Sequence, residues 1–207
     1  MSFASVSFLL FFLVVLLLLL LVQRVLPFAE IKRRIICQGI LLIASYVFYG
    51  WWNMRLCLLL MGITWISFFT AVKKDEKHLR QSRISLLIGV GTPLAVLGIF
   101  KYYDFFVTSF CDVFHLTPGV LNLILPVGIS FYTFQALSYT IDVYTGKIEK
   151  EKSFLQFALY LSFFPQLVAG PIVKASEFLP QLKENRKVTL AGLESGIQIF
   201  VFGMFKK

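Results

Sequence analysis

Uncharged apolar runs, each close to the length of one bilayer crossing, alternate with short charged segments in the first half of this chain. Residues 3–22 contain no charged side chain, and about 20 apolar residues span the hydrocarbon core of a bilayer. Three further apolar runs cover residues 35–49, 56–72 and 84–100. The pattern predicts four transmembrane helices, so residues 1–114 are interpreted as a transmembrane scaffold.

The fourth apolar run contains a proline and ends in a polar cluster. Pro93 has no backbone N–H, and we therefore expect it to kink the helix. Lys101, Tyr102, Tyr103 and Asp104 form an interfacial cluster that is expected to end this helix. Residues 105–114 are then expected to continue along the outer surface.

Composition and charge support membrane insertion. Hydrophobic residues make up 58% of the 207 residues and charged residues 15%, whereas soluble domains are about half apolar and a quarter charged. The net charge of +9 comes largely from Lys and Arg clusters between the apolar runs, notably at residues 32–34 and 73–83. Such clusters are typical of cytoplasmic loops, so we predict an outside amino terminus and no nucleic-acid partner.

A different pattern fills residues 115–207, where proline, glycine and polar residues interrupt the apolar runs. Residues 126–144 are predicted to form a helix. Residues 174–185 are predicted to form a polar interfacial helix, and residues 189–207 the start of another helix. Together these features predict a second region whose helices differ in kind from those of the scaffold.

Residues 153–172 are predicted to form a re-entrant element. Ser153 is a suitable N-cap for a helix of about 12 residues, which is too short to cross a bilayer. Two prolines and a glycine follow between Pro165 and Pro171, in a segment too apolar for an exposed loop. Irregular backbone at membrane depth is tolerated where it lies within protein or lines a cavity, and we expect this element to line a cavity.

Three polar residues share one face of the helix predicted at 126–144. Gln135, Ser138 and Asp142 are spaced i, i+3 and i+7. Polar side chains at membrane depth usually face the interior of a bundle or a water-filled cavity. For Asp142 a second interpretation is equally open, in which the carboxylate lies at the cytoplasmic interface close to Lys147.

Motifs of soluble enzymes are missing from the sequence. It contains no phosphate-binding loop of the Walker type, no nucleophile elbow and no metal-ligand spacing. The two histidines, His78 and His115, are expected in solvated loops. The three cysteines lack metal or redox spacing and are expected to be apolar helix residues.

Three separated segments resemble hallmarks of the membrane-bound O-acyltransferase family. They are residues 125–135, 139–144 and 163–172, and they occur in the order found in that family. Residues 44–52 and 100–103 also fit its bacterial branch, which contains the alginate O-acetylation membrane protein and the D-alanyl transfer protein of teichoic acids. The chain is thereby identified as a member of this branch.

The resemblance implies an all-α, polytopic protein of the bacterial cytoplasmic membrane that contains part of an acyltransferase core. It implies transfer of an acyl group, from acetyl-CoA or another cytoplasmic thioester and without a bound cofactor, to an extracellular or cell-wall polysaccharide. An extracellular acyltransferase or another polysaccharide-modifying protein is the expected partner. The residues expected to line or brace the tunnel are Gln135, Ser138, Asp142, Gln166 and Gly170.

Members of the family are more than twice as long as this chain, and their catalytic histidine lies in the later half. Neither His78 nor His115 matches that position, so no catalytic residue is assigned. The chain therefore resembles an amino-terminal fragment that we expect to be inactive alone. A transporter or channel component is the alternative, because broken helices with polar groups near the midplane also occur there. Inverted repeats would favour transport, and a membrane-embedded histidine further along the gene would favour transfer.

Overall fold

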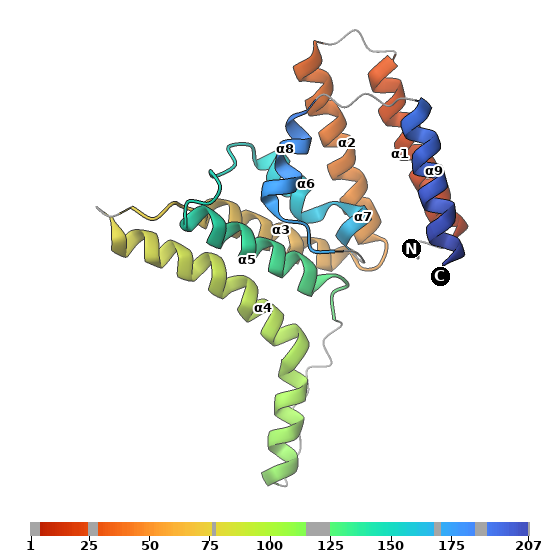
Figure 1. Cartoon of the computed structure of the whole chain (residues 1–207). Coiled ribbons are helices and arrows are strands. Elements are labelled where there is room, and N and C mark those ends of the chain that lie inside the picture. The colour runs from red at the N-terminus through yellow and green to blue at the C-terminus, as the bar shows by residue number, and fades with distance from the viewer. Residues whose placement is uncertain are drawn as a thin grey trace.

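The computed structural model of the chain describes residues 5–24, 29–75, 78–114, 125–167, 171–184 and 190–206 (Figure 1). All regular secondary structure in these ranges is helical. The helices are α1 Val6–Arg24, α2 Glu30–Gly50, α3 Met54–Thr70, α4 Leu79–Phe114, α5 Ile129–Tyr144, α6 Phe154–Ser162, α7 Phe164–Leu167, α8 Ala175–Lys183 and α9 Leu190–Phe205. The predicted all-α class is confirmed.

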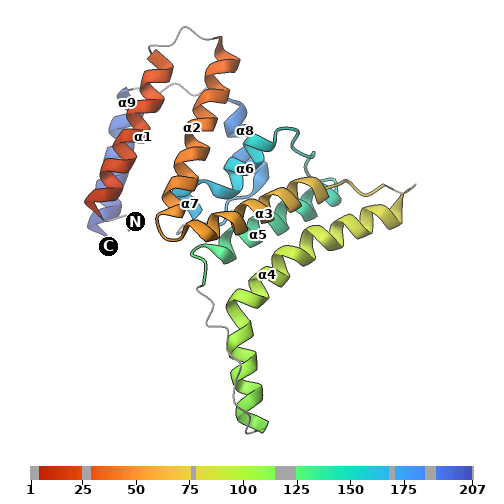
Figure 2. The same ribbon diagram turned by 180° about the vertical axis from the view of Figure 1, so that it is seen from behind.

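Helices α1 and α2 form an antiparallel pair at one side of the molecule (Figures 1 and 2). An aromatic cluster joins this pair to α7, with Phe8 and Phe11 from α1, Phe48 from α2 and Phe164 from α7. The ring centroids of Phe11 and Phe164 are 5.4 Å apart in an edge-to-face arrangement. The short helix α7 is therefore held against the first two helices by aromatic packing.

Helix α2 begins earlier than the hydropathy pattern predicted. Its first residue is Glu30, so the basic cluster at residues 32–34 lies within the first two turns of the helix instead of in a loop. Lys and Arg are good helix formers, and charge alone therefore does not mark a helix boundary.

Helix α4 is one continuous helix of 36 residues, so the predicted end at Lys101–Asp104 was wrong. At 1.5 Å per residue it is about 54 Å long, well beyond the roughly 30 Å of a bilayer core. The helix bends near its middle, and its second half projects away from the other helices (Figures 1 and 2). Pro93 lies inside the helix and removes one of its backbone hydrogen bonds, which accounts for a bend without a break.

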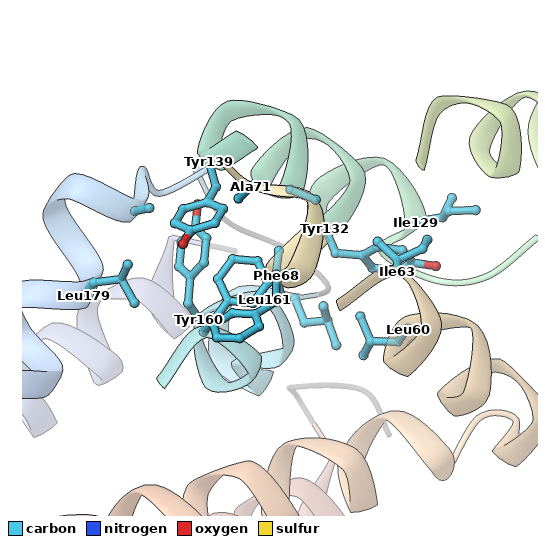
Figure 3. Packing of buried hydrophobic residues seen from close by; sticks show 14 of the residues in the cluster. Leu60, Ile63, Phe68, Ala71, Ile129, Tyr132, Tyr139, Tyr160, Leu161 and Leu179 are labelled. Carbon is cyan, nitrogen blue, oxygen red and sulfur yellow. The ribbon is translucent and has the colours of Figure 1, made fainter. Parts of the chain in front are cut away.

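The largest hydrophobic cluster lies where α3, α5 and α6 meet, with contributions from α2, α4, α7 and α8. Helix α6 contacts α2, α3, α5 and α8, and residues 156–162 are all buried. Figure 3 shows part of this cluster, with Tyr139 and Tyr160 close together and Phe68 beside Leu161. Helix α6 is therefore the central element of the fold.

The element predicted at residues 153–172 begins as expected but breaks earlier. The Ser153 hydroxyl accepts a hydrogen bond from the Gln156 N–H at 3.4 Å, which confirms the predicted N-cap. The helix is interrupted at Phe163, and Pro165 lies in the first turn of α7. A proline is tolerated there because N–H groups in the first turn have no partner within the helix.

Within the described residues, two helices are long and apolar enough to cross a bilayer by length and composition, α1 with 19 residues and α4 with 36. Helix α3, with 17 residues, is shorter and apolar. Helix α9 is also apolar, and every side chain described in it is exposed. Among the described residues, α1, α9 and the second half of α4 therefore present most of their apolar surface outward.

Candidate functional site

Asp142 lies on the last turn of α5, and its carboxylate contacts two other side chains. Its carboxylate forms an ion pair with the Lys147 ammonium at 3.5 Å and accepts a hydrogen bond from the Ser138 hydroxyl at 3.4 Å. Its backbone carbonyl accepts the Lys147 N–H at 2.9 Å, which closes the turn after the helix. The Asp142 side chain is 16% exposed and lies beside Lys147.

Gln135 lies two turns before Asp142 on the same helix. Its side chain is 2% exposed, so it is inside the protein and does not face the surroundings. Gln135 is therefore the most buried of the three polar residues on this face of α5.

Gln166 braces the break between α6 and α7. Its side-chain amide donates to the Tyr160 carbonyl at 3.1 Å. That carbonyl belongs to the last turn of α6, where backbone acceptors have no partner within the helix. Gly170, the remaining candidate, lies outside the described residues. The structure thus brings Ser138 and Asp142 into contact and places Gln166 at a separate junction.

Glu151 is a second centre of polar contacts, and the sequence analysis did not identify it. One carboxylate oxygen accepts the N–H groups of Lys152 at 2.9 Å and Ser153 at 3.1 Å. The other forms an ion pair of 2.8 Å with the Lys183 ammonium. The Glu151 side chain is 5% exposed and that of Lys183 is 56% exposed. One carboxylate therefore joins the turn after α5 to the end of α8.

The pKa of Glu151 reflects these contacts. Burial by itself would raise it, but the Lys183 ammonium and the backbone N–H groups of Ser153 and Lys152 outweigh burial and hold the pKa below its usual value. Glu151 is therefore ionised at neutral pH and acts as an anchor. A sequence signal for this role was available only in part, as an acidic residue two positions before the N-cap Ser153.

The carboxyl end of α8 is bound from α2 as well. The Arg34 guanidinium donates to the Lys183 carbonyl at 2.6 Å, and the Gln38 amide donates to the Leu182 carbonyl at 2.7 Å. Both carbonyls belong to the last turn of α8, where C=O groups have no N–H partner within the helix. At the other end, the Tyr160 hydroxyl donates to the Val173 carbonyl at 3.1 Å. Helix α8 is therefore fixed at both ends by side chains from other helices.

The histidines and cysteines, to which the sequence assigned no functional role, lie where they were expected as far as they are described. His78 is exposed and pairs with Asp75 at 2.9 Å, whereas His115 lies outside the described residues. Cys57 and Cys111 are buried in helices and Cys37 is partly buried. Within the described ranges no group of three His, Cys, Asp or Glu side chains could hold a metal ion.

These polar contacts can hold neighbouring helices and loops in place, but the described residues that make them do not form an acid–base pair around a reacting centre. Gln135, the Ser138–Asp142 pair and Glu151 lie on α5 or in the turn that follows it, and all are at least partly buried. Polar groups held in this way can fix the walls of a site whose reactive groups come from elsewhere.

Comparison with curated proteins gives significant matches over 81% of the chain. It is 38% identical to a probable alginate O-acetylase of Pseudomonas putida and 37% identical to that of Pseudomonas aeruginosa, over 174 residues each. It is 36% identical over 194 residues to a peptidoglycan O-acetyltransferase of Helicobacter pylori. The matches cover 36%, 33% and 37% of those proteins, so the chain spans about a third of the length of the relatives it matches.

Two other comparisons add no further relative. No known family profile matches the chain. No solved structure matches it either.

Proposed function

The chain is homologous to members of the membrane-bound O-acyltransferase family, and from this premise we propose that it takes part in O-acetylation of a polysaccharide in the cell envelope. The observation that carries the proposal is the identity of 36% to 38% with two kinds of O-acetylating protein across most of the chain. One is named for alginate and the other for peptidoglycan, and both polymers contain sugar hydroxyl groups that can be acetylated.

We further propose that the chain is a multi-pass protein of the bacterial cytoplasmic membrane with its amino terminus outside. Nine large apolar side chains of α1 are exposed, and only Phe8, Val15 and Val22 of this helix are buried. An exposed surface of this kind suits lipid and would be costly in water. The basic clusters at residues 32–34 and 73–83 support a cytoplasmic location for these segments, because Lys and Arg are enriched in cytoplasmic loops.

The proposed reaction takes an acyl group from a cytoplasmic thioester, for which acetyl-CoA is the proposed donor. An acceptor hydroxyl attacks the thioester carbonyl while a general base removes its proton, and hydrogen-bond donors stabilise the oxyanion of the tetrahedral intermediate. Collapse of this intermediate breaks the C–S bond, leaves the acyl group as an oxygen ester and releases the thiolate, which takes up the proton. In this proposal Gln135, Ser138, Asp142, Gln166 and Gly170 line or brace the path, and the base comes from another part of the protein. An extracellular acyltransferase would be the partner that hands the group to the polymer.

Deletion of the gene that encodes this chain tests the proposal. Ester-linked acetate is released from purified exopolysaccharide and peptidoglycan by mild base and then quantified. We expect the acetate of one polymer to fall to background and to return when the wild-type gene is restored. Unchanged acetate on every envelope polymer would refute the proposed function, and loss from one polymer would identify the acceptor.

The bracing role of α5 predicts that Gln135→Ala and Asp142→Asn lower acetate transfer. Gln135→Ala removes a buried amide, and Asp142→Asn removes a partly buried charge whose hydrogen bond from Ser138 is of the charged kind that contributes about 1.5–3 kcal/mol. A loss of roughly 1.4 kcal/mol in the transition state would reduce transfer about tenfold. Transfer is measured as polymer-bound acetate at native expression.

Two further variants give the controls. Gln181→Ala changes an exposed amide on α8 and should leave transfer unchanged, with membrane abundance checked by immunoblot. Lys147→Met removes the partner of Asp142 and should lower transfer less than Asp142→Asn, because the Lys147 side chain is mostly exposed. Full transfer by Gln135→Ala and Asp142→Asn at normal abundance would contradict the assigned role.

A further inference from the structure

Four lysines gather where the chain that leaves α3 meets the turn that follows α5. This lysine patch consists of Lys73, Lys74, Lys147 and Lys150. The Lys74 N–H donates to the Tyr144 carbonyl at 3.1 Å, which joins the two segments. The Lys73 side chain runs beside Gly146, where an added Cβ would lie 3.3 Å from Lys73 Cε. The patch therefore combines charges from two parts of the chain that are distant in sequence.

Two charges of the lysine patch have no counter-charge. Lys147 forms an ion pair with Asp142 at 3.5 Å. Among the described residues, neither Lys73 nor Lys150 has a carboxylate partner, and Glu149 in the same turn is exposed and pairs with neither. The patch therefore has cationic groups available to an anion from outside the protein.

The Lys150 ammonium is held over an aromatic ring. It lies 5.4 Å from the centroid of the Phe68 ring, and the lysine side chain is partly buried. Burial lowers the pKa of Lys150, because burial disfavours the charged form. An anionic group beside the ammonium would offset this cost. A lysine whose stem covers apolar surface while its charge reaches the edge is typical of a membrane interface.

An apolar stripe runs along the exposed side of α3 toward the lysine patch. Its members are each more than half exposed, and they are Met54, Leu58, Met61, Trp65 and Phe69. Their spacing of three or four residues places them on one helical face. Phe69 packs edge to face against Phe68 with ring centroids 5.3 Å apart, so the stripe reaches the ring that carries Lys150. Figure 2 shows α3 on an outer side of the bundle, with α5 behind it.

The apolar stripe and the lysine patch together match an anionic phospholipid. Met61 to Phe69 covers about 12 Å of helix at 1.5 Å per residue, and one leaflet is half of the roughly 30 Å hydrocarbon core. An acyl chain can therefore follow the stripe while its phosphate lies at the lysines. A free phosphate compound would leave the stripe uncovered, and an uncharged lipid would leave the lysines without a counter-charge.

We propose that Lys73 and Lys150 bind the headgroup phosphate of an anionic phospholipid whose acyl chain lies along the apolar stripe of α3. The inference rests on the membrane location proposed above, and it places the lipid in the cytoplasmic leaflet. The bound lipid holds the chain that leaves α3 against the turn that carries Lys147 and Glu151. It thereby supports the polar contacts made at the end of α5.

Native mass spectrometry of the full chain purified in detergent tests the proposal. The apparent affinity for the first bound lipid is measured with dioleoyl-phosphatidylglycerol and with dioleoyl-phosphatidylcholine, which has the same chains but no net charge. We expect phosphatidylglycerol to bind at least about fivefold more tightly, which is the effect of one lysine near an anionic surface. Equal affinities would overturn the proposal. Displacement of phosphatidylglycerol by equimolar inorganic phosphate or coenzyme A would also overturn it, because the patch would then bind a free phosphate ligand.

Variants of the patch and the stripe locate the lipid. Lys73→Met and Lys150→Met should each weaken phosphatidylglycerol binding about fivefold, whereas Lys150→Arg keeps the charge and should retain binding. Trp65→Ala shortens the stripe and should weaken the binding of both lipids. Lys101→Met is the matched control, because Lys101 also lies over an aromatic ring, that of Tyr102 at 5.3 Å, but on α4 outside the patch. Unchanged phosphatidylglycerol binding by both patch variants would contradict the assigned site.

Cell fractionation separates the lipid site from its premise. A chain that is recovered in the membrane fraction and shows no preference for phosphatidylglycerol overturns the lipid site alone. Recovery in the soluble fraction overturns the membrane location and the lipid site together.

Discussion

Substitution of Gly128 by alanine is expected to destabilise the protein more than any other single methyl addition in its described part. Gly128 has φ of 77°, a left-handed conformation that costs other residues about 1–2 kcal/mol. A Cβ at this position would also lie 2.2 Å from the Leu167 carbonyl oxygen, which is backbone and cannot move aside cheaply. Together with about 1–3 kcal/mol for overpacking, the expected loss is about 2–5 kcal/mol.

Gly146→Ala is the matched control for this prediction. Gly146 has nearly the same conformation, with φ of 75°, but its nearest neighbour would be the flexible Lys73 side chain at 3.3 Å. It should therefore show only the conformational cost of about 1–2 kcal/mol. The comparison is made by thermal unfolding in detergent and by yield from membranes. Equal losses for the two variants would mean that the contact between Gly128 and Leu167 does not constrain the fold.

Removal of the Glu151 carboxylate is expected to cause the second large loss of stability. Glu151→Ala abolishes the ion pair with Lys183 and leaves the N–H groups of Lys152 and Ser153 without their acceptor. Hydrogen bonds to a charged group contribute about 1.5–3 kcal/mol, so the expected loss of stability is about 3 kcal/mol. Lys183→Met should cost less than about 1 kcal/mol, because this lysine is more than half exposed and its charge is screened. Equal losses for the two variants would locate the stabilisation in the ion pair instead of in the backbone contacts.

The same carboxylate predicts a dependence of stability on pH. The pKa of Glu151 is lower in the folded protein than its unfolded value of about 4.3. The stabilisation is therefore complete above the unfolded pKa and is lost as pH falls through the folded pKa. Glu151→Gln keeps an acceptor oxygen but cannot ionise, so its Tm should fall less than that of the wild type on acidification. Parallel pH profiles for the two proteins would exclude this contribution.

The membrane-like half of the chain was accessible from the pattern of apolar residues. Helices α1 and α3 lie within about three residues of their predicted ranges, because their ends coincide with the ends of apolar runs. The ends of α2 and α4 were misjudged for a related reason, since polar residues were taken as helix ends. Lys32, Arg33 and Arg34, and later Lys101 to Asp104, are compatible with a helix, and no breaker accompanies them.

From the sequence, contacts of the candidate residues could be predicted only between positions close together on one helix. Ser138 and Asp142 are four residues apart on α5, and the contact between them follows from helical spacing. The role of Gln166 depended on where α6 breaks, and the break was expected two residues later, at Pro165. The role of Gln166 as a brace for Tyr160 was therefore visible only in the structure.

The sequence by itself determined the helical class, the apolar segments and the resemblance carried by residues 125–144 and 163–172. Only the tertiary structure showed that Glu151 binds Lys183, that Arg34 and Gln38 bind the end of α8, and that Tyr49 meets Tyr132. The physical reason is the range of the interactions. Hydropathy and helical periodicity act over a few residues, whereas Gln38 and Leu182 are 144 residues apart and meet only because packing around α6 brings α2 and α8 together.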